Sequence, residues 1–379
     1  MKIIADENIP LLHDFFSEIG DILTLPGREI TAEVIEGADV LLVRSVTQVN
    51  SNLLNNSSIN FVATATAGVD HIDQAYLHQH QIGFSHAPGC NALAVAEYVL
   101  AALDVIVEKY QFNLQDRVIG VVGKGQVGSR LVNIFQRMGL NVMVSDPFCN
   151  RVEDVTFVPL DLLIERCDVI CLHTPLTTMG AYPTHHMIAT RQLESMKEGT
   201  VLVSAGRGGV IDNTALKHSL KQGKDLKVVM DVWENEPKID RTLLAQVDVA
   251  TPHIAGHSLD GKIAGTALIY QACCQFFDLP PGINVSALIP AAPLRAMDFG
   301  DNVTADQAAS LAIKAVYDIR RDDIWMRQLL RMDNVAAKMA FDRMRKNYPV
   351  RREFSSLRVR SQCSDQRVQQ RLSALGFHS

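Results

Sequence analysis

The 379-residue chain is predicted to be an α/β protein with two doubly wound parallel-sheet domains and a smaller C-terminal piece that mixes helices and strands. Three observations predict this class. Strand-like and helix-like runs alternate in two successive series up to residue 284. The composition, 47% apolar and 21% charged, is that of a globular protein. Beyond residue 284 both the rhythm and the sign of the net charge change.

The sequence also indicates the cellular compartment in which the protein is expected. No apolar run approaches the ~18 residues needed to span a bilayer. The start, MKIIADENIP, is interrupted by two acids and predicts a first strand rather than a signal peptide. The seven cysteines are odd in number and form no C-x-x-C pair. We therefore expect reduced thiols in a cytoplasmic protein without a zinc site.

The first series predicts a flavodoxin-like parallel sheet with crossover helices. Helical patterns, such as residues 11–20, separate its strands, and a long helix follows at 91–110, where Asn91 can serve as N-cap. This helix is long enough to join two domains. The expected strands are residues 2–6, 21–25, 39–44, 60–66 and 82–87.

The second series predicts another parallel sheet. Its run 248–256 closes the series, and a helix at 262–278 returns the chain toward the first domain. The expected strands are residues 116–122, 141–146, 168–173, 199–205 and 226–232.

The C-terminal piece differs from the body in charge. From residue 285 onward there are 16 Lys and Arg and 10 Asp and Glu, which gives this piece a net charge of +6. The whole chain has a net charge of −6, so residues 1–284 carry a net charge of −12. We expect helix over 304–332, a strand over 353–360 and a last helix over 365–376. A basic cluster suggests either a solvated face or an anion-binding patch; nucleic acid is disfavoured because the protein is acidic and no aromatics interleave the cluster. Its members are Arg343, Arg345, Lys346, Arg351, Arg352, Arg358 and Arg360.

The segment GKGQVG (123–128) predicts a dinucleotide site. Gly123 permits a tight turn, Gly125 lets the backbone approach a pyrophosphate, and Gly128 lets the helix pack on the strand. The amides of the helix start, near Gln126 and Val127, face the negative charge. Asp146 follows the next strand, where a carboxylate accepts from both ribose hydroxyls and repels a 2′-phosphate, so we predict NAD rather than NADP. The alternative is a doubly wound domain with a plain glycine turn.

Three segments after predicted strands carry candidate catalytic groups. Arg207 in SAGRGGVID suits bidentate capture of a carboxylate. DVWENEP carries Asp231 and Glu236, and TPHIAG carries His253. A carboxylate beside an imidazole orients the ring and makes a general acid/base. Alternatively, Arg207 braces a loop and the histidine is structural.

With these residues in place, the sequence resembles the D-isomer-specific 2-hydroxyacid dehydrogenases. The resemblance extends over residues 1 to about 285 and keeps the family's order of motifs. The matching segments are VRSVT (43–47), TAGVDHID (66–73), GKGQVG (123–128), LHTPLT (172–177), MKEGTVLVSAGRGGVID (196–212), DVWENEP (231–237) and TPHIAG (251–256).

The resemblance implies a domain layout and residue roles. It implies an NAD-binding Rossmann domain (93–253) inserted into a split substrate domain (1–92 and 254–284), with 285–379 as a dimerisation domain. Arg207 would anchor the substrate carboxylate, and Glu236 would partner the acid/base His253. Substrate contacts would come from Ser45 and Thr66. Cofactor contacts would come from Thr174, Ala205, Gly206, Arg207, Asp231 and Gly256.

Within the family, the start MKIIADENIP and the C-terminal piece of about 95 residues resemble a homodimeric branch that oxidises 4-phospho-D-erythronate in vitamin B6 (pyridoxine 5′-phosphate) synthesis. In that branch a Tyr that contacts substrate follows the HIAG glycine; here the position is His257, which can also donate a hydrogen bond but is shorter. Arg44, or the basic cluster, would supply cations for the substrate phosphate.

Two alternatives remain at this point. One is another member of the family, a phosphoglycerate or hydroxypyruvate dehydrogenase, whose regulatory tail would show a βαββαβ rhythm. The other is an NAD-sensing binding protein of the corepressor kind, which shares the fold without turnover. The Arg–Glu–His set favours an enzyme with a small-molecule substrate, without nucleic acid or membrane as partner.

Overall fold

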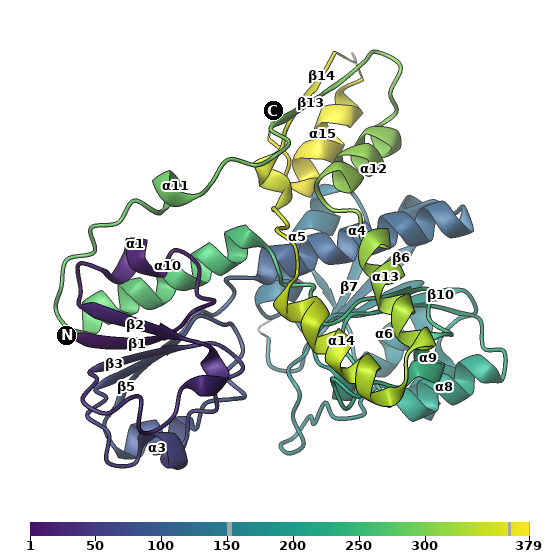
Figure 1. Cartoon of the computed structure of the whole chain (residues 1–379). Coiled ribbons are helices and arrows are strands. Elements are labelled where there is room, and N and C mark those ends of the chain that lie inside the picture. Colours follow the sequence, from purple (N-terminus) through teal and green to yellow (C-terminus); the bar gives the residue numbers. More distant parts are fainter. Residues whose placement is uncertain (150–153, 363–364, 379) are drawn as a thin grey trace. The chain divides into compact units, whose positions relative to one another are not determined.

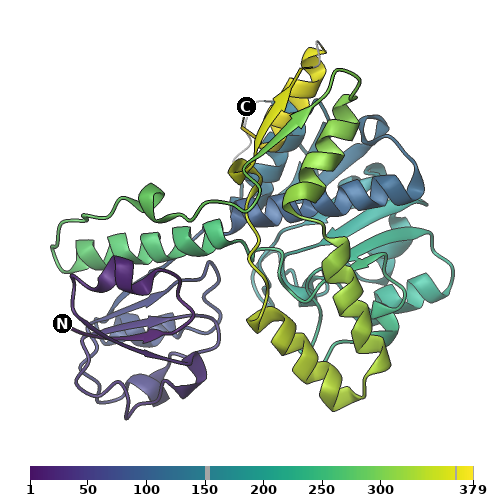
Figure 2. The same ribbon diagram turned by 45° about the horizontal axis from the view of Figure 1, so that its top comes forward.

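The computed structural model describes residues 1–149, 154–362 and 365–378. It confirms the α/β class with two parallel sheets (Figures 1 and 2). By packing, the chain forms two compact units: residues 1–91 with 258–291, and residues 92–257 with 292–379. The C-terminal residues therefore pack with the second sheet. Cys363 lies outside the described residues.

The first unit is built on a five-stranded parallel sheet in the order β2-β1-β3-β4-β5, a flavodoxin-like order. Helices α1 (Leu12–Phe16) and α10 (Leu259–Phe276) cover one face, and α2 (Ser51–Leu54) and α3 (Gln74–Gln79) cover the other. Both faces are apolar, as a sheet with helices on both sides requires. The strands are β1 (Lys2–Asp6), β2 (Asp21–Leu25), β3 (Val40–Val43), β4 (Phe61–Thr64) and β5 (Gly83–His86).

The second unit is built on a seven-stranded parallel sheet in the order β12-β11-β10-β9-β6-β7-β8. The order reverses between β6 and β9, so the loops after these two strands flank the crevice where doubly wound folds bind ligands. The strands are β6 (Val118–Val122), β7 (Asn141–Ser145), β8 (Thr156–Phe157), β9 (Val169–Leu172), β10 (Thr200–Ser204), β11 (Leu226–Met230) and β12 (Val249–Ala250).

Two helical layers cover this sheet. The long helix α4 (Ala92–Tyr110) and α5 (Gln126–Arg137) share one apolar core with one face. The opposite core involves the other helices of the sheet, which are α6 (Leu160–Arg166), α7 (Thr190–Ser195), α8 (Asn213–Lys221) and α9 (Arg241–Leu244).

The C-terminal residues add helices and one parallel strand pair. After α11 (Val285–Leu288), strands β13 (Ala296–Phe299) and β14 (Arg358–Ser361) pair, and α12 (Ala305–Val316) and α15 (Gln366–Leu375) pack against each other beside them (Figure 1). Their apolar side chains join the core of α4 and α5. Helices α13 (Arg320–Arg327) and α14 (Asn334–Lys346) join the opposite core.

Two sequence expectations for this region need correction. The helix expected over 304–332 is broken after Val316, because the extended backbone at Tyr317 directs this ring into the core. The strand expected over 353–360 begins only at Arg358: Phe354 and Leu357 are both fully buried, a spacing of three that fits the 3₁₀ turn observed at Phe354–Ser356 rather than a strand.

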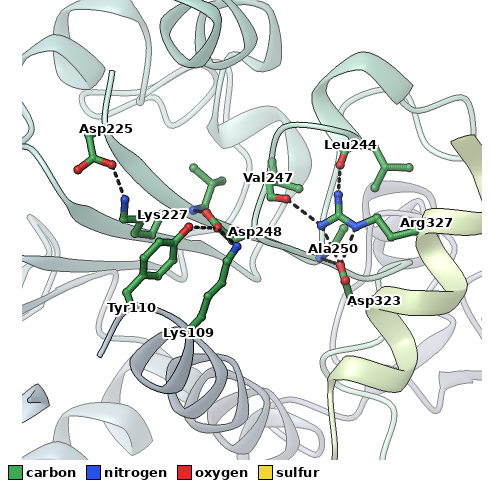
Figure 3. Close-up of polar contacts among 11 residues, drawn as sticks. Lys109, Tyr110, Asp225, Lys227, Leu244, Val247, Asp248, Ala250, Asp323 and Arg327 are labelled. Atoms are coloured by element: carbon green, nitrogen blue, oxygen red, sulfur yellow. Dashed lines mark hydrogen bonds and ion pairs between the residues drawn. The ribbon is translucent and has the colours of Figure 1, made fainter. Parts of the chain in front are cut away.

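The outer edge of the second sheet is closed by side chains rather than by another strand (Figure 3). Asp323 of α13 accepts a hydrogen bond from the Ala250 amide at 2.8 Å, and Arg327 donates to the carbonyls of Leu244 and Val247. Nearby, Asp248 accepts from Lys109 at 2.6 Å and from the Val228 amide. Covering an edge strand in this way satisfies its backbone and fixes its register.

Among the helices that the structure describes, we find none with the length and apolarity needed to cross a membrane.

Candidate active site

The glycine-rich loop lies between β6 and α5, and each glycine has a separate steric reason. A Cβ on Gly128 would stand 1.9 Å from the Gly123 carbonyl oxygen, so helix and loop touch there. Gly123 has φ +88° and passes close to the His173 carbonyl. A Cβ on Gly125 would meet nothing within 4 Å. Gly125 thus faces open space directly before the α5 amides of Gln126 and Val127, an arrangement that can accommodate a phosphate group.

Asp146 follows β7 at the same edge of the sheet. Its Oδ2 accepts from the Lys124 amide at 2.7 Å and its Oδ1 from the Phe148 amide at 2.9 Å. These bonds hold the carboxylate beside the glycine loop. Each carboxylate oxygen has a further lone pair, which suits the two hydroxyls of a ribose.

Thr174, Ala205 and Gly206 come together from the ends of β9 and β10. A Cβ on Gly206 would lie 3.2 Å from the Thr174 carbonyl oxygen. The Thr174 hydroxyl is buried and has no hydrogen-bond partner within the described part of the chain. Since a buried polar atom normally has a hydrogen-bond partner, the Thr174 hydroxyl is compatible with a site in which a bound ligand supplies that partner.

His173, in the same loop, is a residue that sequence reasoning did not single out. Both its ring nitrogens are buried without a hydrogen-bond partner among the described residues. Burial lowers the pKa of the His173 imidazole to about 3. The ring is therefore neutral at the wall of the cofactor crevice, and only its place in LHTPLT pointed to it.

The predicted contact between Glu236 and His253 is present. His253 Nδ1 and Glu236 Oε2 lie 2.7 Å apart, and the side chains are 33% and 17% exposed. Burial alone would raise the pKa of Glu236, but the hydrogen bond and charge of His253, the Trp233 amide bond and the charge of Arg345 hold that pKa below its usual value. An ionised Glu236 only accepts, so the Nδ1–H of His253 donates the hydrogen bond between them.

Asp231 holds the loop that presents His253. Its buried carboxylate accepts from the Thr251 hydroxyl at 2.6 Å and from the amides of Ile254 and Ala255 at 2.7 and 3.0 Å. His253 itself has φ +57°, a left-handed backbone that a non-glycine residue adopts only when its surroundings impose it. The Asp231 bonds supply that constraint.

Arg207 is half-buried on the loop after β10, next to the loop that carries Glu236. A Cβ on Gly208 would stand 1.9 Å from the Trp233 carbonyl oxygen, and the Trp233 amide donates to Glu236 at 2.9 Å. Arg207 Nη1 donates to the Gly206 carbonyl at 3.0 Å. The loops of Arg207, Glu236 and His253 are thus joined by direct contacts.

Arg44, Ser45 and Thr66 belong to the first unit, where they follow the neighbouring strands β3 and β4. Ser45 is exposed and Arg44 is half-buried. The Thr66 hydroxyl donates to the Gly68 carbonyl at 2.9 Å and accepts from Thr64. Its proton is therefore in use, which leaves the hydroxyl oxygen and nearby backbone amides for a ligand.

The C-terminal residues contribute to the surroundings of the site through an aromatic contact that sequence reasoning did not anticipate. The Tyr348 ring lies edge-on to the His257 ring, with centroids 5.7 Å apart. The basic cluster expected as one face or patch is divided. Arg343, Arg345 and Lys346 lie on α14 and Arg358 and Arg360 on β14, while Arg351 is buried. Arg352 lies between Arg351 and β14 and is half-buried.

One His/Glu cluster has the composition of a metal site. His185, His186 and Glu234 place ligand atoms within 4.8 Å of one another. The two rings stack at 3.9 Å with 20° between their planes, so their in-plane lone pairs run nearly parallel instead of converging on one ion. His186 Nε2 and Glu234 Oε1 are 2.6 Å apart, and this bond ties the β9 and β11 loops together.

Comparison with known proteins gives the class. Residues 100–255 match the family model "D-isomer specific 2-hydroxyacid dehydrogenase, NAD binding domain", and residues 288–376 match a "Domain of unknown function (DUF3410)". A solved structure of NAD⁺-bound 3-phosphoglycerate dehydrogenase from Entamoeba histolytica is 26% identical, with a TM-score of 0.61 over 75% of this chain and 98% of its own. The protein is an NAD-dependent dehydrogenase of the D-isomer-specific 2-hydroxyacid class.

Full-length relatives narrow this further. Erythronate-4-phosphate dehydrogenase of Azotobacter vinelandii is 47% identical over 99% of both chains, and that of Hahella chejuensis is 44% identical over 100% of this chain and 99% of its own. The chain belongs to the family of the erythronate-4-phosphate dehydrogenases. The TT0316 protein of Thermus thermophilus shares the fold, with a TM-score of 0.65 at 24% identity over 74% of this chain and 98% of its own.

Proposed function

We propose that this chain oxidises 4-phospho-D-erythronate at carbon 2 with NAD, giving 3-hydroxy-2-oxo-4-phosphooxybutanoate for pyridoxine 5′-phosphate synthesis. The observation that carries the proposal is the 2.7 Å His253–Glu236 pair, on loops contiguous with that of Arg207, at the ligand-binding edge of an NAD-binding sheet. The full-length relatives support the choice of substrate through their names.

NAD fits the second unit. The Gly125 cradle and α5 amides suit its pyrophosphate, Asp146 its adenosine ribose, and Thr174, Ala205, Gly206 and Gly256 the nicotinamide half. When bound, NAD supplies the hydride acceptor. The Asp231 carboxylate is already bonded to Thr251, Ile254 and Ala255. We therefore assign Asp231 an indirect role near the cofactor, in which it holds the loop that follows β12.

Proton transfer belongs to His253. Its Nε2 lone pair takes the proton of the 2-hydroxyl as the hydride leaves carbon 2, and the ring becomes an imidazolium. Glu236 stabilises that charge through the Nδ1–H bond, and its low pKa keeps the carboxylate ionised near neutral pH. Such acid/base help is typically worth ~10²–10⁴ in rate.

The substrate carboxylate is assigned to Arg207, and Ser45, Thr66 and His257 stay predicted substrate contacts. A guanidinium binds a carboxylate through two parallel hydrogen bonds, which fixes its orientation as well as its position. Carbon 2 is then presented to the acid/base and the hydride acceptor together.

The substrate phosphate requires separate cations, and we assign Arg44 and Arg345 as candidates. Arg345 lies on the last turn of α14, its charge reaches Glu236, and its Nε is buried without a hydrogen-bond partner among the described residues. We expect Arg345→Glu to weaken binding of phosphoerythronate at least tenfold, with little change for plain erythronate. A charge-assisted hydrogen bond to phosphate contributes about 1.4 kcal/mol or more, and this energy corresponds to a tenfold change in affinity. Arg352→Glu is tested alongside. Equal losses for both ligands would contradict the assignment.

The assembly and compartment are also proposals. We assign residues 285–379 to homodimer formation, and the three-part division 1–92 with 254–284, 93–253 and 285–379 stays a prediction. A reducing cytoplasm also stays a prediction, and it is compatible with the buried thiols of Cys167, Cys171, Cys273 and Cys274.

The alternatives fit less well. A phosphoglycerate enzyme with a regulatory tail would need a βαββαβ C-terminal region. The described residues there instead form several helices and one pair of strands, β13 and β14. A corepressor-like role would not need a joined acid/base pair.

The deciding experiment is a substrate panel. Purified protein with NAD and a series of D-2-hydroxy acids, each with and without a terminal phosphate, is followed at the NADH absorbance near 340 nm. We expect the highest kcat/KM for 4-phospho-D-erythronate. Faster turnover of 3-phosphoglycerate, or no turnover of any acid, would overturn the proposal.

A further inference from the structure

The loop that carries His253 is gripped at both ends by residues of the C-terminal region. At its start, Asp323 of α13 accepts from the Ala250 amide at 2.8 Å. At its end, Arg351 Nη2 donates to the Ala255 carbonyl. Thr251, Pro252, His253 and Ile254 lie between these two contacts.

Arg351 itself is buried and contacts three other elements of the second unit. It is 3% exposed, its guanidinium lies 4.4 Å from the centroid of the Tyr317 ring, and it also donates to the Ala94 carbonyl in the first turn of α4 at 3.1 Å. A buried guanidinium is costly unless its donors are used. Both of these hydrogen bonds come from Nη2, whereas Nη1 is buried without a partner among the described residues. Arg351 thus supplies a side-chain donor to a backbone carbonyl in the loop after β12.

The opposite side of the loop is held by Asp231, which bonds the amides of Ile254 and Ala255. Ala255 is therefore held at its N–H by Asp231, directly after β11, and at its C=O by Arg351 of the C-terminal region. His253, two residues earlier, has the left-handed φ of +57° that such clamping must maintain.

We propose that Arg351 is a positioning residue of the active site: it fixes the Ala255 peptide and so keeps His253 aligned with Glu236 during proton transfer. The C-terminal region is then part of the catalytic apparatus of each chain, in addition to any role in assembly. This inference rests on the proposed function, because the alignment matters only if His253 moves the substrate proton.

The main test uses Arg351→Met, which keeps most of the side-chain volume and removes the donors, and Arg351→Lys, which keeps the charge but not the fork. We expect kcat to fall about 10- to 100-fold in Arg351→Met and less in Arg351→Lys, since small misplacements of catalytic groups have effects of this size. KM for the 2-hydroxy acid should change less than kcat. Added guanidinium ion should restore part of the Arg351→Met rate.

Two readouts separate positioning from general unfolding. ADP-ribose lacks the nicotinamide ring and reports on the glycine loop, so its affinity and stoichiometry should be unchanged in both variants. Hydrogen exchange should increase at the amides of residues 253–257 and not in β6 or α5. Arg367→Met is the matched control, because Arg367 is an exposed arginine of the same region, paired with Asp365, and should leave turnover unchanged.

Asp323→Ala tests the other grip and should show the same pattern in a milder form. Turnover within twofold of wild type in Arg351→Met and Arg351→Lys would overturn the inference, as would a loss of turnover that only parallels a loss of ADP-ribose sites. Failure of every variant to fold would also count against it. If wild-type protein forms no NADH, the proposed function fails instead, while the exchange result still reports whether Arg351 holds the loop.

Discussion

At the scale of single residues, the proposed chemistry depends on one imidazole, that of His253, whose two nitrogens would have different roles. His253 Nδ1 is committed to Glu236 at 2.7 Å, which orients the ring and leaves Nε2 for substrate. The pKa of Glu236 is held low by the bonds from His253 and Trp233 in spite of burial. The carboxylate therefore remains ionised over the pH range in which an imidazole exchanges protons.

His253→Ala should lower kcat by ~10²–10⁴, because the proton then has no positioned acceptor. Binding of ADP-ribose should not change, since the glycine loop is untouched. Steady-state NADH formation and a fluorescence titration measure the two quantities. Turnover within tenfold of wild type would show that another base is used.

His173 should make the protein lose stability in acid. Its folded-state pKa of about 3 lies below the unfolded value of 6.5, so below pH 6.5 the unfolded chain gains a proton that the folded chain refuses. We expect wild type to lose about 2 kcal/mol more unfolding free energy than His173→Gln between pH 7 and pH 5. Urea denaturation at both values measures this. Parallel losses in the two proteins would mean that the folded ring titrates normally.

At the scale of elements, the β6–α5 turn separates a packing glycine from a binding glycine. Gly128 allows helix α5 to touch the Gly123 carbonyl, whereas Gly125 borders open space. The protein backbone itself therefore excludes a side chain at Gly128. At Gly125 we expect the dinucleotide, when bound, to exclude one.

Gly128→Ala should destabilise the protein by about 1–3 kcal/mol, because its Cβ would overlap backbone. Gly125→Ala should leave the melting temperature nearly unchanged and weaken NAD at least tenfold, because its Cβ would enter the phosphate cradle. Thermal unfolding and NAD titration of both variants make the comparison. The reverse pattern would place the pyrophosphate elsewhere.

At the scale of the whole molecule, the C-terminal region combines buried ties with an exposed apolar surface. Its inner side joins the two cores of the second unit. Its outer side exposes Ile324, Val335 and Met339, with 62%, 71% and 67% of each residue accessible. Val335 and Met339 are four residues apart on α14 and so share one face.

We expect the chain to sediment as a dimer of 41.8 kDa subunits, and Val335→Glu with Met339→Glu to shift it toward monomer, since a charge at an apolar interface is strongly unfavourable. Sedimentation at several concentrations tests this, and Arg367→Met again serves as control. A monomeric wild type would contradict the assigned dimer. An undisturbed dimer in the double variant would place the interface on another surface.

The alternation of strands and helices and the glycine motif were readable from sequence because each depends on local pattern. The period of apolar residues reports which face is buried, and glycine spacing reports a turn. The secondary structure of the C-terminal region was predicted less accurately. Burial of Phe354 and Leu357 at a spacing of three makes a 3₁₀ turn, and the exposed face of α14 gave no strong signal of its own.

By itself, the sequence determined the α/β class, the NAD-binding loop and the candidate set Arg207, Glu236 and His253, because strand ends of one parallel sheet must meet at one edge. Only the tertiary structure decided that Glu236 bonds His253, that Asp231 holds the loop between them, and that Arg351 is a buried tie rather than part of a basic surface. These facts depend on contacts between residues far apart in the sequence: Ala255 and Arg351 are 96 positions apart, and Ala94 and Arg351 are 257 positions apart. No local pattern encodes which distant backbone carbonyl an arginine will reach.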